Sequence, residues 1–156
     1  MRYSLPTPPG YPYNMRFPRE GTSMELPQPA KDLLHGKVFA HVITTNKSGT
    51  PQVTLVWVDE KDGDLVFNTN MARQKAVNLG RDPRVTVSVQ NLEAPGQYLL
   101  VRGQAELVTE NAYDHINELS NKYSGKDYPK NEGEVRVMVR VKADRVTGAG
   151  PWVQQN

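Results

Sequence analysis

The 156-residue sequence contains no cysteine, which excludes disulfide bonds, thiolate metal ligands and cysteine nucleophiles. It has three histidines, His35, His41 and His115, too far apart in sequence to form a ligand-spaced pair, so we expect no zinc or iron site. It also lacks an apolar run of membrane length and a basic leader followed by an apolar stretch. We therefore expect a cytoplasmic protein that contacts no membrane.

An excess of one charge is also missing, because 19 basic residues face 17 acidic ones. The basic residues are scattered rather than gathered in a stripe, which argues against a nucleic-acid partner. The length suits one hydrophobic core. We expect a proline-rich arm over residues 1–30, one folded domain over residues 31–148 and a tail over residues 149–156.

Proline is abundant only at the start of the chain. The arm contains Pro6, Pro8, Pro9, Pro12, Pro18, Pro27 and Pro29, with Tyr3, Tyr11, Tyr13 and Phe17 between them. Proline removes a backbone donor and fixes the backbone, so we expect an extended segment. Its aromatic side chains favour docking on another surface, and a disordered tail is the alternative.

Alternating β-branched segments, separated by turn residues, predict six strands: Val38 to Thr45, Pro51 to Asp59, Leu65 to Asn68, Arg84 to Gln90, Tyr98 to Val108, and Glu134 to Val146. Gly103 suggests a bulge in the fifth strand. In the second strand, Val53, Leu55, Trp57 and Asp59 share one face, and Gln52, Thr54, Val56 and Val58 share the other. In the sixth, Val135, Val137, Val139 and Val141 share a face. Arg136 and Arg140 take the other face, which we expect to point to solvent, with the partner chain or an anionic substrate as the alternatives.

Helical patterns lie between these segments. We expect one helix from Pro29 to His35 with Leu33 and Leu34 facing inward, a short one that carries Arg73 and ends at Gly80, and one from Ala112 to about Tyr123 capped by the residues Thr109 to Asn111. The fold class is mainly β (α+β), a six-stranded antiparallel barrel with flanking helices at its openings. A sandwich is the alternative.

The segment from Phe67 to Leu79 is the strongest candidate for a binding site. A strand runs through Asn68 and Thr69 into a helical segment with Arg73 and Lys75. Where a strand gives way to a helix, backbone N–H groups and the helix dipole can bind one phosphate, which the two cations would neutralise. The alternative is a solvated helix face.

Four segments together resemble a known family: GTPQVTLVWVD (Gly49 to Asp59), LVFNTNMARQKAVNLGRDPRVTVSV (Leu65 to Val89), YLLVRGQAELV (Tyr98 to Val108) and NKYSG (Asn121 to Gly125). The chain is similar to the flavin/deazaflavin oxidoreductases with the pyridoxamine-phosphate-oxidase-like split β-barrel, also called the FMN-binding split barrel. The Arg-x-Lys-x-x-Asn-Leu segment resembles the branch that binds coenzyme F420, and FMN is the alternative cofactor.

The resemblance implies roles for individual residues. Arg73 and Lys75 would hold the cofactor phosphate, supported by Asn78 and Thr69. The remaining cofactor-binding residues implied are Gln52, Val53 and Thr54 along the ring, Asn68 beside the linker, and Val87 and Val89 lining the ring pocket. It further implies a homodimer with the site at the interface, and the tail around Trp152 and the arm before Pro18 are candidates for the partner's contribution.

The implied function is an F420-dependent oxidoreductase that transfers hydride from the reduced cofactor to an unsaturated small molecule. An FMN-dependent oxidase or reductase, and a non-catalytic cofactor- or haem-binding protein, are the alternatives. No catalytic residue is assigned, because Tyr98, Tyr123, His41 and bound water are all candidate proton donors. We favour a core position for His41 and a packing role for Trp57 in the core or at a dimer interface.

Overall fold

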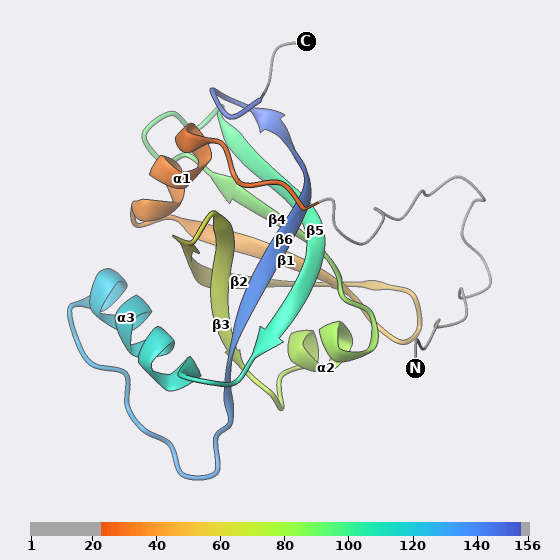
Figure 1. The fold of residues 1–156 in the computed structure, drawn as a ribbon, viewed down its shortest axis with the longest axis vertical. Coiled ribbons are helices and arrows are strands. Elements are labelled where there is room, and N and C mark those ends of the chain that lie inside the picture. The colour runs from red at the N-terminus through yellow and green to blue at the C-terminus, as the bar shows by residue number, and fades with distance from the viewer. Residues whose placement is uncertain (1–22, 154–156) are drawn as a thin grey trace.

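The computed structural model describes residues 23–153, and six strands in this range close into one barrel (Figure 1). The strands are β1 (Phe39–Thr45), β2 (Pro51–Lys61), β3 (Asp64–Asn70), β4 (Arg84–Gln90), β5 (Tyr98–Val108) and β6 (Arg136–Ala149). They pair antiparallel in the closed order β1-β2-β3-β6-β5-β4. The predicted antiparallel barrel is confirmed, and the sandwich alternative is wrong.

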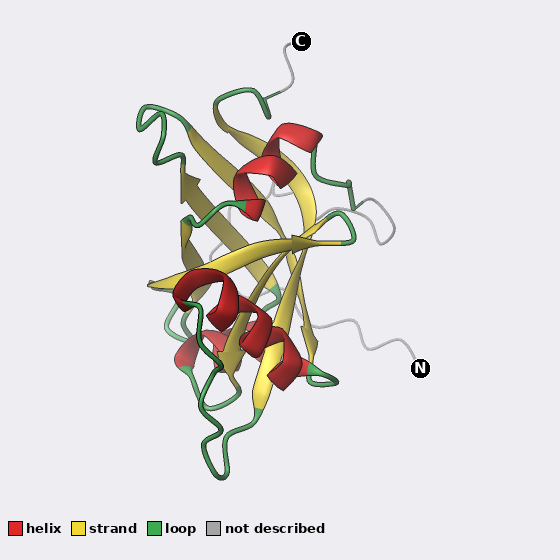
Figure 2. Ribbon diagram, turned by 90° about the vertical axis from the view of Figure 1, so that its left-hand side faces the viewer, coloured by secondary structure: helices red, strands yellow, loops and turns green. Residues whose placement is uncertain are grey.

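Three helices accompany the barrel: α1 (Gln28–His35), α2 (Gln74–Arg81) and α3 (Ala112–Ser124). Figures 1 and 2 show α1 and α2 toward opposite ends of the molecule, while α3 packs against β2, β3 and β6. Helix α2 continues through Gly80, the predicted cap, and ends where the Asp82 N–H donates to the Asn78 carbonyl. Asn111 precedes α3 in a left-handed conformation and makes no side-chain cap, so that predicted cap is wrong.

The barrel interior is filled by alternate residues of each strand, as the period of two requires. Leu65, Phe67, Val139 and Val141 belong to this core. Strand β3 is buried on both faces, because α3 covers its outer face.

Two expectations about strand faces are wrong. Val135 lies before β6 and is 54% exposed, so it does not join the row of valines that follows. His41 is exposed, because its neighbours Ala40 and Val42 occupy the inward positions of β1.

Gly103 forms the predicted irregularity in β5. The register with β6 shifts between Arg102 and Gly103. A Cβ atom at Gly103 would lie 2.0 Å from the Lys142 carbonyl oxygen, which is far closer than contact distance. Glycine is therefore required here by the close approach of the two strands.

The segments that flank the barrel also pack against it. The Met24 N–H donates to the Ala143 carbonyl (2.8 Å), and the Leu26 N–H donates to the Gly63 carbonyl (3.0 Å). Trp152 is 2% exposed, and its indole N–H donates to the Tyr98 carbonyl (2.9 Å). Trp152 is thus a core residue of its own chain and is not available to a partner's site. The aromatic residues predicted to dock the arm lie outside the described residues.

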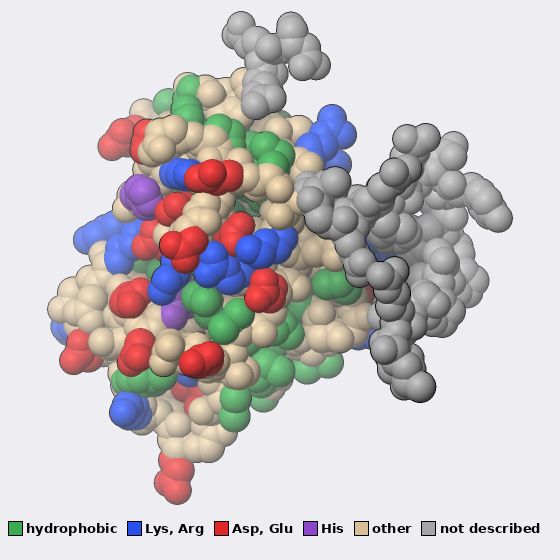
Figure 3. All heavy atoms as spheres, viewed as in Figure 1, with side chains coloured by type: hydrophobic (Ala, Val, Ile, Leu, Met, Phe, Trp, Pro, Cys, Tyr) green, Lys and Arg blue, Asp and Glu red, His purple; other side chains and the backbone are tan. Residues whose placement is uncertain are grey.

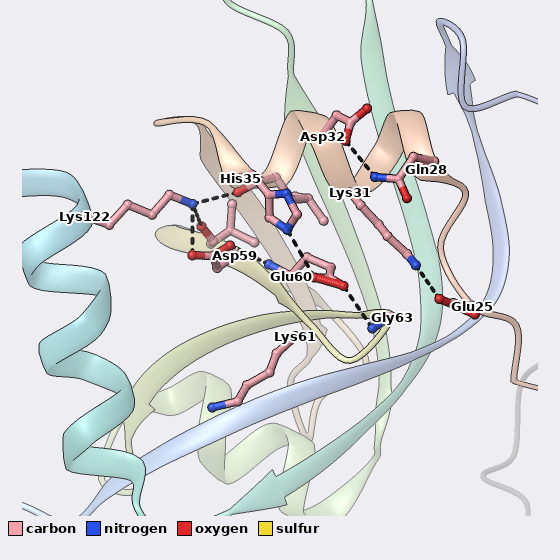
Figure 4. A network of polar contacts seen from close by, with 12 residues as sticks. Glu25, Gln28, Lys31, Asp32, His35, Asp59, Glu60, Lys61, Gly63 and Lys122 are labelled. Atoms are coloured by element: carbon pink, nitrogen blue, oxygen red, sulfur yellow. Dashed lines mark hydrogen bonds and ion pairs between the residues drawn. The ribbon is translucent and has the colours of Figure 1, made fainter.

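Polar contacts join α1 to β2 and to α3. Figure 3 shows basic and acidic side chains interleaved over the middle of the face in view, and Figure 4 shows part of this network. His35 Nε2 lies 3.2 Å from Glu60 Oε2, and Lys122 Nζ donates to the carbonyls of Leu34 (2.7 Å) and Val58 (3.0 Å).

None of the helices in residues 23–153 is long and apolar enough to cross a membrane.

Candidate cofactor site

A cavity of about 300 Å³ lies where the end of β3, the start of α2, helix α3 and the start of β6 meet. It is lined by Phe39, Leu55, Val56, Trp57, Asn68, Thr69, Asn70, Arg73, Lys75, Ile116, Leu119, Tyr128 and Arg136. Of the residues predicted from the sequence, Asn68, Thr69, Arg73 and Lys75 are brought together here. The lining combines cationic and amide side chains with apolar and aromatic ones.

Lys75 is the most unusual residue of the lining. Its side chain is buried, with 8% exposed, yet its ammonium has no hydrogen bond or ion pair with any residue that the structure describes. Burial lowers the pKa of Lys75, and the neighbouring charges of Arg73 and Arg136 lower it further. A buried charge without a partner is costly, so an anion entering the cavity would relieve an existing penalty.

The turn between β3 and α2 sets up the cationic side of the cavity. The Ala72 N–H donates to Asn70 Oδ1 (2.8 Å), and the Arg73 N–H donates to the Asn70 carbonyl (2.9 Å). This turn makes Arg73 the N-cap residue of α2, and its side chain does not cap the helix. The first turn of α2 therefore adds backbone N–H groups and the positive end of a helix dipole to Arg73 and Lys75.

Arg136 forms part of the cavity wall and Arg140 pairs with Asp64, so neither side chain faces solvent, the favoured expectation. Arg136 Nε donates to Asn68 Oδ1 (2.9 Å), and Arg136 Nη1 donates to Glu134 Oε1 (2.8 Å) and the Tyr128 hydroxyl (3.3 Å). The Arg136 guanidinium also lies over the Tyr128 ring, 4.9 Å from its centre. Arg136 is therefore a positioned cation with a neighbouring carboxylate, in contrast to Lys75.

Tyr123 packs against Phe39 and Trp57, which form the aromatic side of the cavity. Trp57 stacks on Tyr123 with ring centres 5.4 Å apart and planes at 8°, and Phe39 packs against it at 5.7 Å. The Tyr123 hydroxyl lies between the carbonyls of Val38 and Val58 and accepts from the Val58 N–H (3.2 Å). Burial raises the pKa of Tyr123, so its hydroxyl keeps its proton. Trp57 therefore presents a fixed flat surface to the cavity, and it does not belong to the barrel core that was one of the two packing roles predicted for it.

Several predicted cofactor contacts lie away from the cavity. Asn78 is fully buried, and its amide donates to Thr44 Oγ1 (3.0 Å) and Asn46 Oδ1 (2.9 Å), which fixes α2 to the β1–β2 hairpin. Gln52 accepts from the Thr44 hydroxyl (3.1 Å), and the Thr54 hydroxyl is buried without a partner in the described chain. Val53 is 54% exposed.

Val87 and Val89 do not line the cavity, so the prediction that they line the ring pocket is wrong. Both have no exposed surface and belong to the barrel core. The alternation of β4 points them inward and leaves Thr86 and Ser88 on the outside. A core valine gives a bound ring no surface to contact.

Residues of α3 were missed as site residues by the sequence reasoning. Ile116 and Leu119 line the cavity although they lie far from the Phe67 to Leu79 segment in sequence, and Tyr128 joins them from the loop that follows α3. The apolar spacing in α3 indicated packing but did not say against what. None of the side chains considered as proton donors, Tyr98, Tyr123 and His41, lines the cavity, whereas Tyr128 does.

The fold and cavity define a class of protein, a small closed β-barrel with a cavity that basic side chains line beside the start of a short helix. The family model described as pyridoxamine 5'-phosphate oxidase matches residues 26–149, and the chain belongs to this family. The comparison with curated proteins found no match.

Solved structures share the fold. A protein named F420 reductase is 29% identical with a TM-score of 0.70, covering 78% of this chain and 98% of its own. The conserved hypothetical protein Rv2991 of Mycobacterium tuberculosis is 24% identical with a TM-score of 0.65, covering 83% of this chain and 88% of its own. A putative pyridoxamine 5'-phosphate oxidase of Listeria innocua is 18% identical with a TM-score of 0.57, covering 74% and 90%.

Proposed function

We propose that this protein is an F420-dependent oxidoreductase that reduces an unsaturated small molecule. The observation that carries the proposal is Lys75, a largely buried lysine whose unpaired ammonium opens into the cavity beside Arg73, with an apolar and aromatic wall opposite. A cofactor with phosphate at one end and a flat ring at the other needs this combination. The 29% identity to a protein named F420 reductase favours F420 over FMN.

Different residues of this chain would bind the phosphate end and the ring end of the cofactor. Arg73 and Lys75 bind the phosphate, one through a planar fork and the other as a point charge, and the Thr69 hydroxyl adds a hydrogen bond. Trp57 and Leu55 form an apolar surface for the ring and exclude water from it. When bound and reduced, F420 supplies the hydride.

FMN is the second candidate, favoured by the family to which the chain belongs. Its phosphate would meet the same two cations, because phosphate recognition does not depend on the ring to which the phosphate is attached. The two cofactors therefore differ in their fit to the aromatic wall, and binding measurements separate them.

A homodimer with the cavity at its interface is part of the proposal. Phe39, Val53 and Leu55 are 42%, 54% and 57% exposed. The pairing of His41 with Leu55 and of Ile43 with Val53 places these side chains on one outer face of β1 and β2. Exposed apolar faces of this kind are typical of interfaces, and Phe39 and Leu55 also line the cavity.

The dimer is tested by sedimentation equilibrium of the full chain and of Val53→Asp. Val53 lies on the apolar face but does not line the cavity. We expect a dimer for the unsubstituted protein and a shift to monomer for the variant, because a buried carboxylate opposes association. A monomeric unsubstituted protein would exclude this part of the proposal.

The cofactor proposal is tested by titrating the protein with F420 and, separately, with FMN while following fluorescence. We expect F420 to bind more tightly, and Arg73→Ala combined with Lys75→Met to weaken binding at least about 100-fold, since each charged hydrogen bond contributes about 1.5 kcal/mol or more. Lys37→Met, an exposed lysine outside the cavity, is the matched control and leaves affinity unchanged.

The other outcomes of this titration are decisive. Tighter binding of FMN would move the protein to the FMN-dependent class with the site intact. Binding of neither cofactor by a correctly folded protein would contradict the proposal. Binding of F420 without oxidation of the reduced form by any unsaturated substrate would favour a non-catalytic binding protein.

A further inference from the structure

His115 is a buried histidine that the proposed function does not use. It lies in α3 with 4% of its surface exposed. Its Nδ1 lies 3.0 Å from the Asn68 amide nitrogen, and the same amide nitrogen donates to the Ala112 carbonyl (2.8 Å). Both amide hydrogens of Asn68 therefore have acceptors on α3.

The other end of the Asn68 amide faces the cavity wall. Its Oδ1 accepts from Arg136 Nε at 2.9 Å. Arg136 can only donate hydrogen bonds, so it requires the amide oxygen on its side and the amide nitrogen toward α3. A rotated amide would set two donors against each other at Arg136 and two acceptors at Ala112. His115, Asn68 and Arg136 thus form one chain of hydrogen bonds with a single consistent direction.

The protonation of His115 fits this direction. A neutral imidazole that accepts at Nδ1 carries its proton on Nε2, and that atom is buried without a partner in the described part of the chain. Burial, aided by the charges of Lys61, Arg136 and Arg140 and opposed by Asp59, lowers the pKa of His115 to about 4. The ring is therefore neutral near pH 7, and its Nδ1 remains an acceptor.

We propose that His115 is a positioning residue that fixes the Asn68 amide and thereby holds the Arg136 guanidinium at the wall of the cavity for the anionic part of the ligand. An apolar side chain would fill the same space without the unpartnered Nε2–H, but it would leave an Asn68 donor without its acceptor. The ligand contact rests on the proposed function. The hydrogen-bond chain itself is a property of the protein without ligand.

The test compares His115→Asn with His115→Leu, side chains of similar size and branching of which only asparagine has an acceptor near the position of Nδ1. In the ligand-free, ¹⁵N-labelled full chain, we expect the His115 ring to be in the Nε2–H form. The Arg136 Nε–H should exchange slowly with water in the unsubstituted protein and His115→Asn, and rapidly in His115→Leu. A ring protonated on Nδ1, or slow exchange that persists in His115→Leu, would overturn the proposal.

The second readout is cofactor affinity, measured with F420 and with FMN. We expect His115→Leu to weaken the binding of whichever cofactor binds by about tenfold and His115→Asn to stay within about twofold, the scale of one charged hydrogen bond. In an Arg136→Ala background, His115→Leu should cause no further loss, because its effect passes through Arg136. A further loss of similar size would show a general structural role for His115 and would refute the proposal that His115 acts through Asn68 and Arg136, which we call the relay.

These readouts separate the two proposals. If the unsubstituted protein binds neither cofactor, the proposed function fails, and the exchange of Arg136 Nε–H still decides whether His115 positions Arg136. If a cofactor binds and Arg136 exchange does not depend on the residue at 115, the relay fails and the proposed function stands.

Discussion

Two groups of basic side chains beside β3 and β6 differ in whether their charges are paired. Near the start of β3, Arg140 Nη2 and Lys142 Nζ lie 3.0 and 2.7 Å from Asp64 Oδ2, and the Asp64 side chain is only 9% exposed. Beyond the other end of β3, Lys75 is largely buried and its ammonium opens into the cavity beside Arg73, without an acidic partner in the described chain. We call these groups the Asp64 cluster and the Lys75 site.

The difference separates the structural role of the Asp64 cluster from the binding role that we propose for the Lys75 site. In the Asp64 cluster the chain supplies its own carboxylate, so the charges are satisfied without a ligand. At the Lys75 site, Glu134 forms an ion pair with Arg136, and no acidic residue of the described chain pairs with Lys75. Glu134 lies near the cavity, but because it pairs with Arg136 it does not neutralise Lys75. In the proposed function, the anionic part of the cofactor does so.

The largest expected effect concerns His115, which experiences charges from both ends of the strand pair, Arg140 of the Asp64 cluster and Arg136 of the cavity wall. Its pKa is lowered from 6.5 to about 4 in the folded state, so the unfolded chain binds the proton more readily. The resulting stability is complete above about pH 6.5 and is lost as the pH falls toward 4.

We expect the free energy of unfolding in urea to fall by roughly 2 kcal/mol between pH 7 and pH 5 through this residue. His115→Asn cannot titrate and should lack this contribution, while keeping the remaining pH dependence of the protein. Equal pH dependence in both proteins would show that His115 is not held neutral by the fold.

The second effect is the loss of stability when the Asp64 cluster is broken. Asp64→Asn removes the carboxylate and leaves two partly buried cations facing each other, so we expect a loss of about 2 kcal/mol in unfolding free energy. Cofactor affinity should not change, because Asp64 does not line the cavity. Asp62→Asn is the control, since Asp62 is 78% exposed and 3.7 Å from Arg140, and it should have no measurable effect. A parallel loss of cofactor affinity in Asp64→Asn would mean that the two regions are not independent.

The third and smallest effect is the salt dependence of cofactor binding, compared with the salt dependence of the Asp64 cluster. Arg73 is exposed and Lys75 opens into the cavity, so ions screen their attraction for an anion. Raising NaCl from about 0.05 to about 0.5 M should weaken cofactor binding by up to about tenfold. The stability difference between Asp64→Asn and the unsubstituted protein should change little over the same range. Salt-independent cofactor binding would argue against an electrostatic contact at Lys75.

The barrel was predictable from the sequence because alternation and turn residues are local signals. The segment from Phe67 to Leu79 was predictable for the same reason, since β3, the turn and α2 are consecutive and place Thr69, Arg73 and Lys75 together. Alternation divides a strand into two faces without saying which is inward. His41 was therefore assigned to the wrong side.

The rest of the cavity depends on tertiary placement. Leu119, Tyr128 and Arg136 reach it because α3 crosses the outer face of β3 and β6, a packing choice that no short motif encodes. Asn78 lies within the recognised motif and was predicted to support Arg73 and Lys75. Its buried amide attaches α2 to the β1–β2 hairpin, so membership of a motif does not by itself establish contact with a ligand.

The most direct test of the comparison is the unfolding free energy, without ligand, of two matched variants, Lys75→Met and Lys142→Met. Each replaces a lysine by an apolar side chain of similar length. We expect Lys75→Met to be more stable than the unsubstituted protein by about 1 kcal/mol, because it removes a buried charge that has no partner. Lys142→Met should be less stable by up to about 1 kcal/mol, because it removes a partner of Asp64. A loss of stability in Lys75→Met would contradict the account, since it would mean that Lys75 is already satisfied by the protein itself.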